Sequence, residues 1–100
     1  MTRQDHLNWI VAEECLEIAQ RMSKIARFGI GEVQPGQARN NRARMLLEFA
    51  DLCGALEKAL PGSDITEMVS ALRPDIDAKK DKIEKFLTYS LECGTLAEVG

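Results

Sequence analysis

Residues 7–28 read LNWIVAEECLEIAQRMSKIARF, and this stretch decides the fold class. Its apolar side chains recur every three to four residues, the spacing that places them on one face of an α-helix; they are Leu7, Ile10, Val11, Ile18, Met22 and Ile25. Gly29 and Gly31 then interrupt the pattern, as glycines do where helices end. We therefore predict a first long helix from about Leu7 to Phe28.

The following residues predict a loop and a second long helix. Pro35 and Gly36 punctuate residues 29–38, which we interpret as a loop within one domain rather than a domain boundary. Residues 42–60 again show the helical spacing of apolar side chains, up to the Pro-Gly pair at 61–62. The two long helices are expected to lie antiparallel.

Two further helices complete the prediction, and no segment has the pattern of a strand. A cap at Ser63 or Asp64 favours a short third helix that ends near Leu72, because Pro74 disfavours helical geometry at the residue before it. Pro74 itself suits the first turn of a fourth helix, which Gly94 ends. The apolar residues of this helix are Ile76, Ile83, Phe86, Leu87 and Leu91.

Length and composition are those of a small globular domain. The chain has 100 residues, of which 45% are apolar and 29% charged, so we predict that residues 1–100 form a single all-α domain. A helical chain this short often completes its core against another subunit, and a homodimer or homotetramer is expected. The net charge of −3 disfavours a nucleic-acid polymer as partner. No apolar run approaches the roughly 20 residues of a membrane span, so we expect a cytoplasmic protein without a membrane partner.

Cysteine usage points to structural thiols. Cys15, Cys53 and Cys93 are odd in number, far apart and in no C-x-x-C pair. This pattern fits neither a disulfide framework nor a zinc site. We predict reduced and mostly buried thiols.

Acidic residues lie within the apolar stripes of both long helices. At about 100° per residue, Glu14 falls in mid-stripe and Glu17 about 60° to one side. In the second helix Glu48 falls among apolar residues and Asp51 at their border. An ionised carboxylate in such a stripe is unfavourable unless a positive group compensates it. Pairs spaced i, i+3 share a helix face, so two antiparallel pairs can surround a hard cation, and oxygen ligands favour Mg²⁺ or Mn²⁺ over zinc.

Other interpretations of these acids remain open. The two acidic patterns can arise by chance on a solvated surface. Buried carboxylates can also pair with cationic side chains in place of a metal; the nearest in sequence are Arg21, Lys24, Arg42 and Arg44. A di-iron carboxylate bundle is disfavoured, because it needs Glu-x-x-His pairs and the chain has none.

The order of the two acidic motifs, E-E-x-x-E at residues 13–17 and E-x-x-D at residues 48–51, resembles the MazG-like, all-α nucleoside triphosphate pyrophosphohydrolases. Residues 24–29, the Asn41-Arg42 pair and the lysine-rich residues 77–83 resemble the short bacterial and phage members. The resemblance implies a four-helix MazG-like bundle that assembles as a dimer or tetramer. It also implies Mg²⁺-dependent hydrolysis of a ribo- or deoxynucleoside triphosphate to the monophosphate and pyrophosphate.

The resemblance assigns roles to the acids. The second and third acids of the first motif and both acids of the second would be the Mg²⁺ ligands, and these are Glu14, Glu17, Glu48 and Asp51. Glu13 would orient a ligand or activate water, so these five acids are the candidate catalytic residues. A non-catalytic nucleotide- or metal-binding module, or a purely structural helical one, is the alternative function.

Further residues are candidates for contacts with the nucleotide. They bring positive charge, an aromatic face or an amide group, and they are Lys24, Arg27, Phe28, Asn41, Lys79, Lys80 and Lys82. Each also has a simpler interpretation as a solvated or packed side chain. Asn41 in particular is equally suited to cap the second helix.

Overall fold

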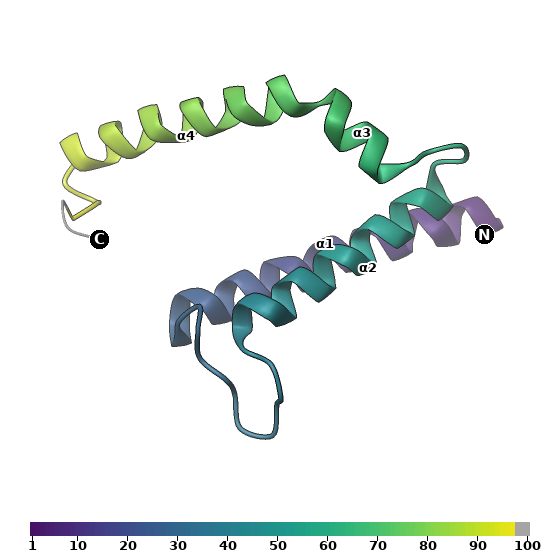
Figure 1. The fold of residues 1–100 in the computed structure, drawn as a ribbon, viewed down its shortest axis with the longest axis horizontal. Helices are drawn as coiled ribbons and strands as arrows, with labels where there is room; N and C mark the ends of the chain where they lie inside the picture. The colour runs from purple at the N-terminus through teal and green to yellow at the C-terminus, as the bar shows by residue number, and fades with distance from the viewer. Residues whose placement is uncertain (98–100) are drawn as a thin grey trace. The chain divides into compact units, whose positions relative to one another are not determined.

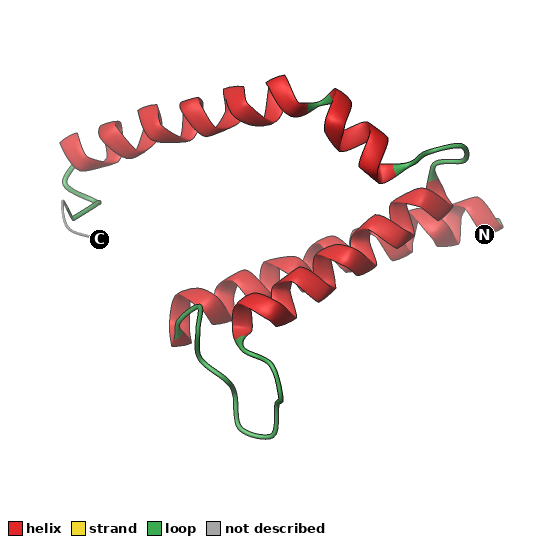
Figure 2. Cartoon of the chain, in the orientation of Figure 1, coloured by secondary structure: helices red, strands yellow, loops and turns green. Residues whose placement is uncertain are grey.

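The computed structural model describes residues 1–97, which form four helices and no strand (Figures 1 and 2). The helices are α1 (Arg3–Phe28), α2 (Asn41–Ala59), α3 (Ile65–Ala71) and α4 (Arg73–Glu92). This confirms the predicted all-α class. None of the four is long and apolar enough to cross a membrane. The chain forms two compact units, one comprising Met1–Ile65 and the other beginning at Thr66.

The first helix begins four residues before its apolar pattern does, at Arg3 instead of Leu7. Thr2 and Asp5 form a capping box, in which the Asp5 amide donates to Thr2 Oγ1 (3.1 Å) and the Thr2 amide donates to Asp5 Oδ2 (2.9 Å). These bonds satisfy amide groups that the first helical turn leaves without partners. Polar residues therefore extend α1 upstream of the stripe that predicted it.

In the first unit α1 and α2 pack as an antiparallel hairpin (Figure 1). The less exposed residues along both helices are three or four positions apart, the spacing of two helices in lengthwise contact. On α1 they include Leu7, Val11, Glu14, Ile18, Arg21 and Ile25, and on α2 Asn41, Met45, Glu48, Leu52, Leu56 and Ala59. Glu14 and Glu48 therefore lie in the seam between the two helices.

Polar contacts hold both ends of this hairpin. Near the start of α1, Gln4 Nε2 donates to the Ala59 carbonyl (2.8 Å). At the other end, Asn41 Nδ2 donates to the Gly29 carbonyl (2.8 Å) and to Glu32 Oε1 (2.9 Å). Among the described residues only Ala59 and Asn41 are buried. The hairpin is thus tied at its ends and has little core between them.

Asn41 does not cap the second helix, so that prediction is wrong. The cap is Asn40, whose side chain accepts a hydrogen bond from the Ala43 amide (2.9 Å). Asn41 is already the first helical residue, and its side chain turns to the loop between α1 and α2. Two adjacent asparagines made the positions indistinguishable by sequence.

The fourth helix begins at Arg73, before Pro74, and the prediction that Arg73 is not helical is also wrong. The Ile76 amide donates to the Leu72 carbonyl (2.9 Å), which closes the first turn around Arg73. Proline is tolerated there because amides in the first turn need no partner within the helix. Leu72 alone separates α3 from α4.

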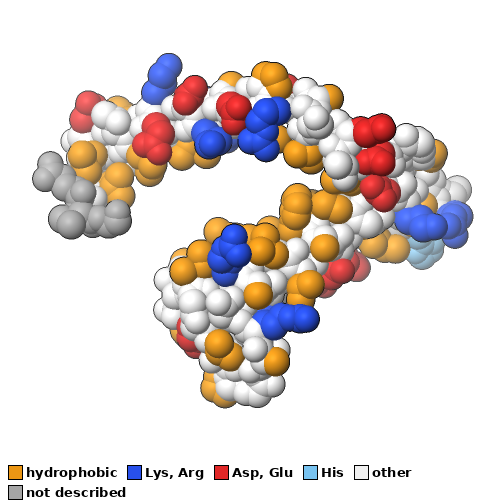
Figure 3. Space-filling view, viewed as in Figure 1, with side chains coloured by type: hydrophobic (Ala, Val, Ile, Leu, Met, Phe, Trp, Pro, Cys, Tyr) orange, Lys and Arg blue, Asp and Glu red, His pale blue; other side chains and the backbone are white. Residues whose placement is uncertain are grey.

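Apolar side chains remain uncovered in both units. Trp9 and Leu16 on α1 are 62% and 66% exposed, and Phe86 and Tyr89 on α4 are 56% and 63% exposed. Figure 3 shows hydrophobic side chains on the visible surface of both units. The cysteines follow the same trend, since Cys15 and Cys93 are exposed and Cys53 is half-buried. The prediction of mostly buried thiols is therefore wrong, because helical spacing alone does not tell which positions of a face are packed against a neighbour.

Candidate functional site

Three carboxyl groups from the two long helices meet in the α1–α2 seam. Each of Glu14, Glu17 and Glu48 contributes one carboxyl oxygen, and these three oxygens lie within 4.8 Å of one another. Glu14 and Glu17 are one turn apart on α1, and Glu48 comes from α2. The structure thus brings together three of the four acids that the sequence nominates as cation ligands.

The remaining two acids of the motifs flank this group. Asp51 and Glu13 are both exposed. Their negative charges nonetheless act on the cluster. Both charges help to raise the pKa of Glu14. The charge of Asp51 also helps to raise the pKa of Glu48. Five carboxyl groups therefore influence one short stretch of the seam.

The crowding changes the acidity of the two seam residues. The pKa of Glu48 is raised, first by a hydrogen bond with the Glu17 carboxyl, then by desolvation and by repulsion from the neighbouring acids. The pKa of Glu14 is raised mainly by desolvation, with repulsion from Glu17 next. Desolvation and repulsion both penalise the ionised form of a carboxyl group. Without a cation the cluster therefore holds its protons to a higher pH than isolated glutamates do.

Two oxygens of the cluster have no partner in the chain. Glu14 Oε2 and Glu48 Oε2 are shielded from solvent and accept no hydrogen bond from the described residues. A shielded polar atom without a partner is unfavourable and is uncommon in folded proteins. These oxygens are therefore suited to bind a group that the chain itself does not provide.

Cationic side chains do not compensate the cluster. Within residues 1–97 none of Arg21, Lys24, Arg42 and Arg44 forms an ion pair with these acids. Arg44 donates instead to Gln34 Oε1 (2.8 Å). The interpretation of the acids as metal-free buried ion pairs therefore lacks its partners. A set of oxygen donors alone fits a hard divalent cation such as Mg²⁺ or Mn²⁺.

The nucleotide-binding candidates of the first unit lie toward the loop end of the hairpin. Lys24 is half-buried on α1. The Arg27 guanidinium lies 4.8 Å from the centre of the Phe28 ring, within cation–π distance. Asn41 is 1% exposed, and its side-chain nitrogen donates to Gly29 and Glu32. Its side chain therefore positions the loop.

The candidates of the second unit are exposed side chains of α4. Lys79, Lys80 and Lys82 are all exposed. Lys80 Nζ lies 4.0 Å from Asp77 Oδ1, and Lys82 Nζ lies 5.9 Å from the centre of the Phe86 ring. These contacts are local to the helix.

Sequence reasoning did not nominate Arg39 or Arg44 as ligand-binding residues. Together with Glu48 they line a cavity of about 210 Å³ beside the acidic cluster. A signal was present, because residues 33–47 contain three arginines and no acidic residue. Their grouping depends on the path of the loop, which helical periodicity does not describe.

Comparisons of the chain with protein-family models, with curated proteins and with solved structures found no significant match.

Proposed function

We propose that the seam cluster holds Mg²⁺ and that the protein hydrolyses a nucleoside triphosphate, of the ribo or deoxy series, to the monophosphate and pyrophosphate. The observation that carries the proposal is the pair of shielded, partnerless oxygens, Glu14 Oε2 and Glu48 Oε2, on facing helices. Glu14, Glu17 and Glu48 would hold the ion, with Asp51 at the rim. Mn²⁺ is the expected substitute.

The chemistry follows from the charge of the substrate. Bound Mg²⁺ would screen the phosphate charges and lower the pKa of a bound water. Glu13, exposed beside the cluster, would orient the attacking water or accept its proton. Attack on the α-phosphorus breaks its bond to the bridging oxygen, and pyrophosphate leaves. No nucleophilic side chain is needed.

Substrate contacts are proposed for the cationic and aromatic residues already described. Lys24, Arg27 and Phe28 follow the acids toward the end of α1. The exposed lysines of α4, Lys79, Lys80 and Lys82, would supply further positive charge to the phosphates. A protein acting on cellular nucleotides belongs in the cytoplasm, and we propose this location.

We also propose that the chain folds as a MazG-like four-helix bundle and that the protein works as a homodimer or homotetramer. A two-helix hairpin cannot enclose a core, and residues on both of its helices remain exposed. The exposed apolar side chains of α1 and α2 include Trp9, Leu16, Met22, Leu46, Leu47 and Phe49. Helices of a second copy would cover them.

The decisive experiment incubates the pure protein with Mg²⁺ and a panel of ribo- and deoxynucleoside triphosphates. Monophosphate and pyrophosphate are then separated by ion-exchange chromatography. We expect pyrophosphate from at least one nucleotide, and its loss in Glu14→Gln and in Glu48→Gln. Glu84→Gln on α4 changes the same charge at an exposed position and should retain activity.

Two outcomes would count against the proposal. Undiminished turnover in both seam variants would show that the cluster is not the site. A rise in melting temperature with Mg²⁺ and nucleotide, without any product, would instead favour the non-catalytic binding module.

A further inference from the structure

A cavity opens next to the acidic cluster, where the loop after α1 reaches the start of α2. Its volume is about 210 Å³, and its walls are formed by Gln37, Ala38, Arg39, Arg44, Leu47 and Glu48. Two of these residues bring guanidinium groups, and Glu48 belongs to the cluster. The cavity therefore joins a positively charged wall to the candidate cation site.

The arginines around this cavity are not paired with acidic side chains of the described residues. Residues 33–47 contain Arg39, Arg42 and Arg44 but no Asp or Glu, although the whole chain has a net charge of −3. Within residues 1–97 none of the three arginines forms an ion pair. The first turn of α2 also has no acidic residue, where helices favour one because their N-terminal end is positive. Glu32, the acid beside this helix end, accepts a hydrogen bond from Asn41.

Arg44 is already held in place. Its Nη1 donates to Gln34 Oε1 (2.8 Å), and the side chain is half-buried. A guanidinium fixed at one nitrogen presents its other N–H groups as a rigid fork, which matches the oxygens of a phosphoryl group. The cavity thus has one ordered anion-binding group that no anion of the chain uses.

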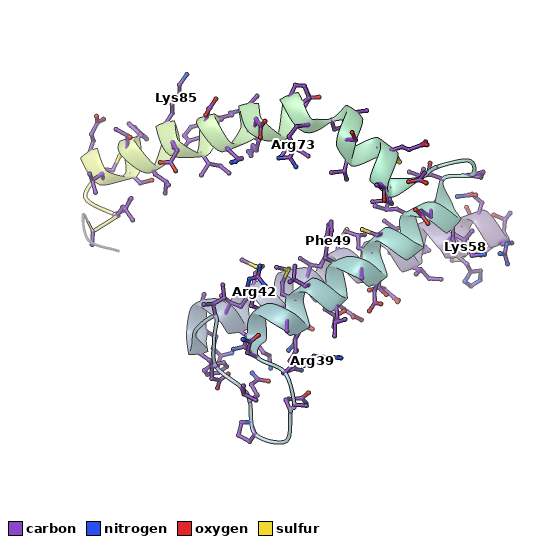
Figure 4. All side chains as sticks on the ribbon, viewed as in Figure 1. Arg39, Arg42, Phe49, Lys58, Arg73 and Lys85 are labelled. Carbon is purple, nitrogen blue, oxygen red and sulfur yellow. The ribbon has the colours of Figure 1, made fainter. Side chains whose placement is uncertain are left out.

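The side chains of Arg39 and Arg42 point in different directions. Figure 4 shows them extending from different sides of the start of α2. Arg39 lines the cavity together with Arg44, and Arg42 does not. The same helix end therefore offers a natural pair for comparison: two arginines of equal charge, only one of which faces the cavity.

We propose that the cavity lined by Arg39 and Arg44 is a binding site for an oxyanion of the pyrophosphate class, the phosphate chain of the substrate. This assignment of the ligand rests on the function proposed above, in which Glu48 holds the cation next to these phosphates. Binding of the anion itself requires only the two arginines. It therefore persists when the metal is removed.

The test is isothermal titration of the full chain with inorganic pyrophosphate in the presence of EDTA. Arg39→Gln and Arg44→Gln should each weaken binding at least about tenfold, as expected when a charge-assisted hydrogen bond is lost. Arg42→Gln removes the same charge outside the cavity and should change the dissociation constant less than about threefold. Glu48→Gln should tighten metal-free binding, because it removes a negative charge from the wall. Since Arg39 is exposed, its substitution leaves the fold intact even if that of Arg44 does not.

Equal weakening in all three arginine variants would overturn the proposal, since only the general field of the helix end would then attract the anion. Absence of pyrophosphate binding by the unaltered protein would overturn it as well. Failure of the hydrolysis proposal looks different: pyrophosphate binds through Arg39 and Arg44, but no nucleotide is cleaved with Mg²⁺. If neither arginine substitution changes hydrolysis, the proposed metal site is retained and the proposed anion site is overturned.

Discussion

One carboxyl oxygen of Glu17 on α1 and one of Glu48 on α2 lie within 4.8 Å of each other across the helix seam. Two carboxyl groups facing each other in this way can share a proton when one of them is protonated. Interaction with the Glu17 carboxyl is the largest cause of the raised pKa of Glu48. A proton or a cation can therefore occupy the same place between the helices, and their competition yields measurable consequences.

Stability of the metal-free protein should fall as the pH rises. The folded-state pKa values of Glu14 and Glu48 lie above the ordinary value of 4.5, so the folded chain binds protons more tightly than the unfolded chain. The free energy of unfolding then decreases from about pH 4.5 upward, through the raised pKa values. Melting curves in EDTA across this range measure it, and Glu48→Gln should flatten the dependence. A melting temperature equally pH-dependent in that variant would contradict the assignment.

Magnesium should reverse this penalty at neutral pH. In the proposed site the ion would bind the ionised cluster in the folded state alone, so the melting temperature of the unaltered protein should rise by several degrees at millimolar Mg²⁺. Glu48→Gln should melt higher than the unaltered protein in EDTA, because like charges no longer face each other, and should gain little from Mg²⁺. Glu84→Gln serves as the control that keeps the full response. A response to Mg²⁺ that survives Glu48→Gln would place the ion elsewhere.

Removal of the Asn41 side chain should loosen the loop between α1 and α2. Asn41→Ala breaks hydrogen bonds to Gly29 and Glu32 in a fully buried position, and about 1 to 3 kcal/mol of unfolding free energy should be lost. Urea denaturation measures the change. Asn40→Ala, which removes only the helix cap, should cost about 1 kcal/mol and provides the comparison. A smaller effect at Asn41 than at Asn40 would show that the loop is not held there.

Assembly should depend on the apolar faces of the hairpin. Light scattering should give the mass of a dimer or tetramer, with a melting temperature that rises with protein concentration. Phe49→Glu, at a position 47% exposed in the single chain (Figure 4), should dissociate the assembly. Lys58→Gln on the same helix is the matched surface change. A monomer of the unaltered protein at all concentrations would refute the proposed oligomer.

Helical periodicity predicted the parts of this molecule that repeat regularly. The stripe that contains Glu14 and the one that contains Glu48 could be located from the sequence, and they do form the seam of the hairpin. The i, i+3 spacing also anticipated that Glu17 would accompany Glu14. These features depend only on helix geometry, which the order of residues determines.

Features that depend on the path of irregular backbone or on uncovered surfaces escaped prediction. Arg39 and Arg44 meet because the loop folds back onto α2, and Gln34 from the same loop holds Arg44. The capping box at Thr2 lengthens α1 through polar contacts that hydrophobic spacing ignores. Exposure of Cys15 could not be foreseen either, since an apolar pattern shows that a face needs cover without showing what covers it.

The hydrogen bonds of Asn41 to Gly29 and Glu32 close the neck of the loop at residues 29–40. Closure at the neck makes the loop a separable part: its tip can change in length or composition while the two helices below keep their alignment. The segment between Pro35 and Arg39 is thus where the sequence can be replaced, because it contributes to the wall of the cavity and lies outside the acidic seam. Ligand preference and the acidic centre can in this way diverge independently, one through the loop and the other through the helices.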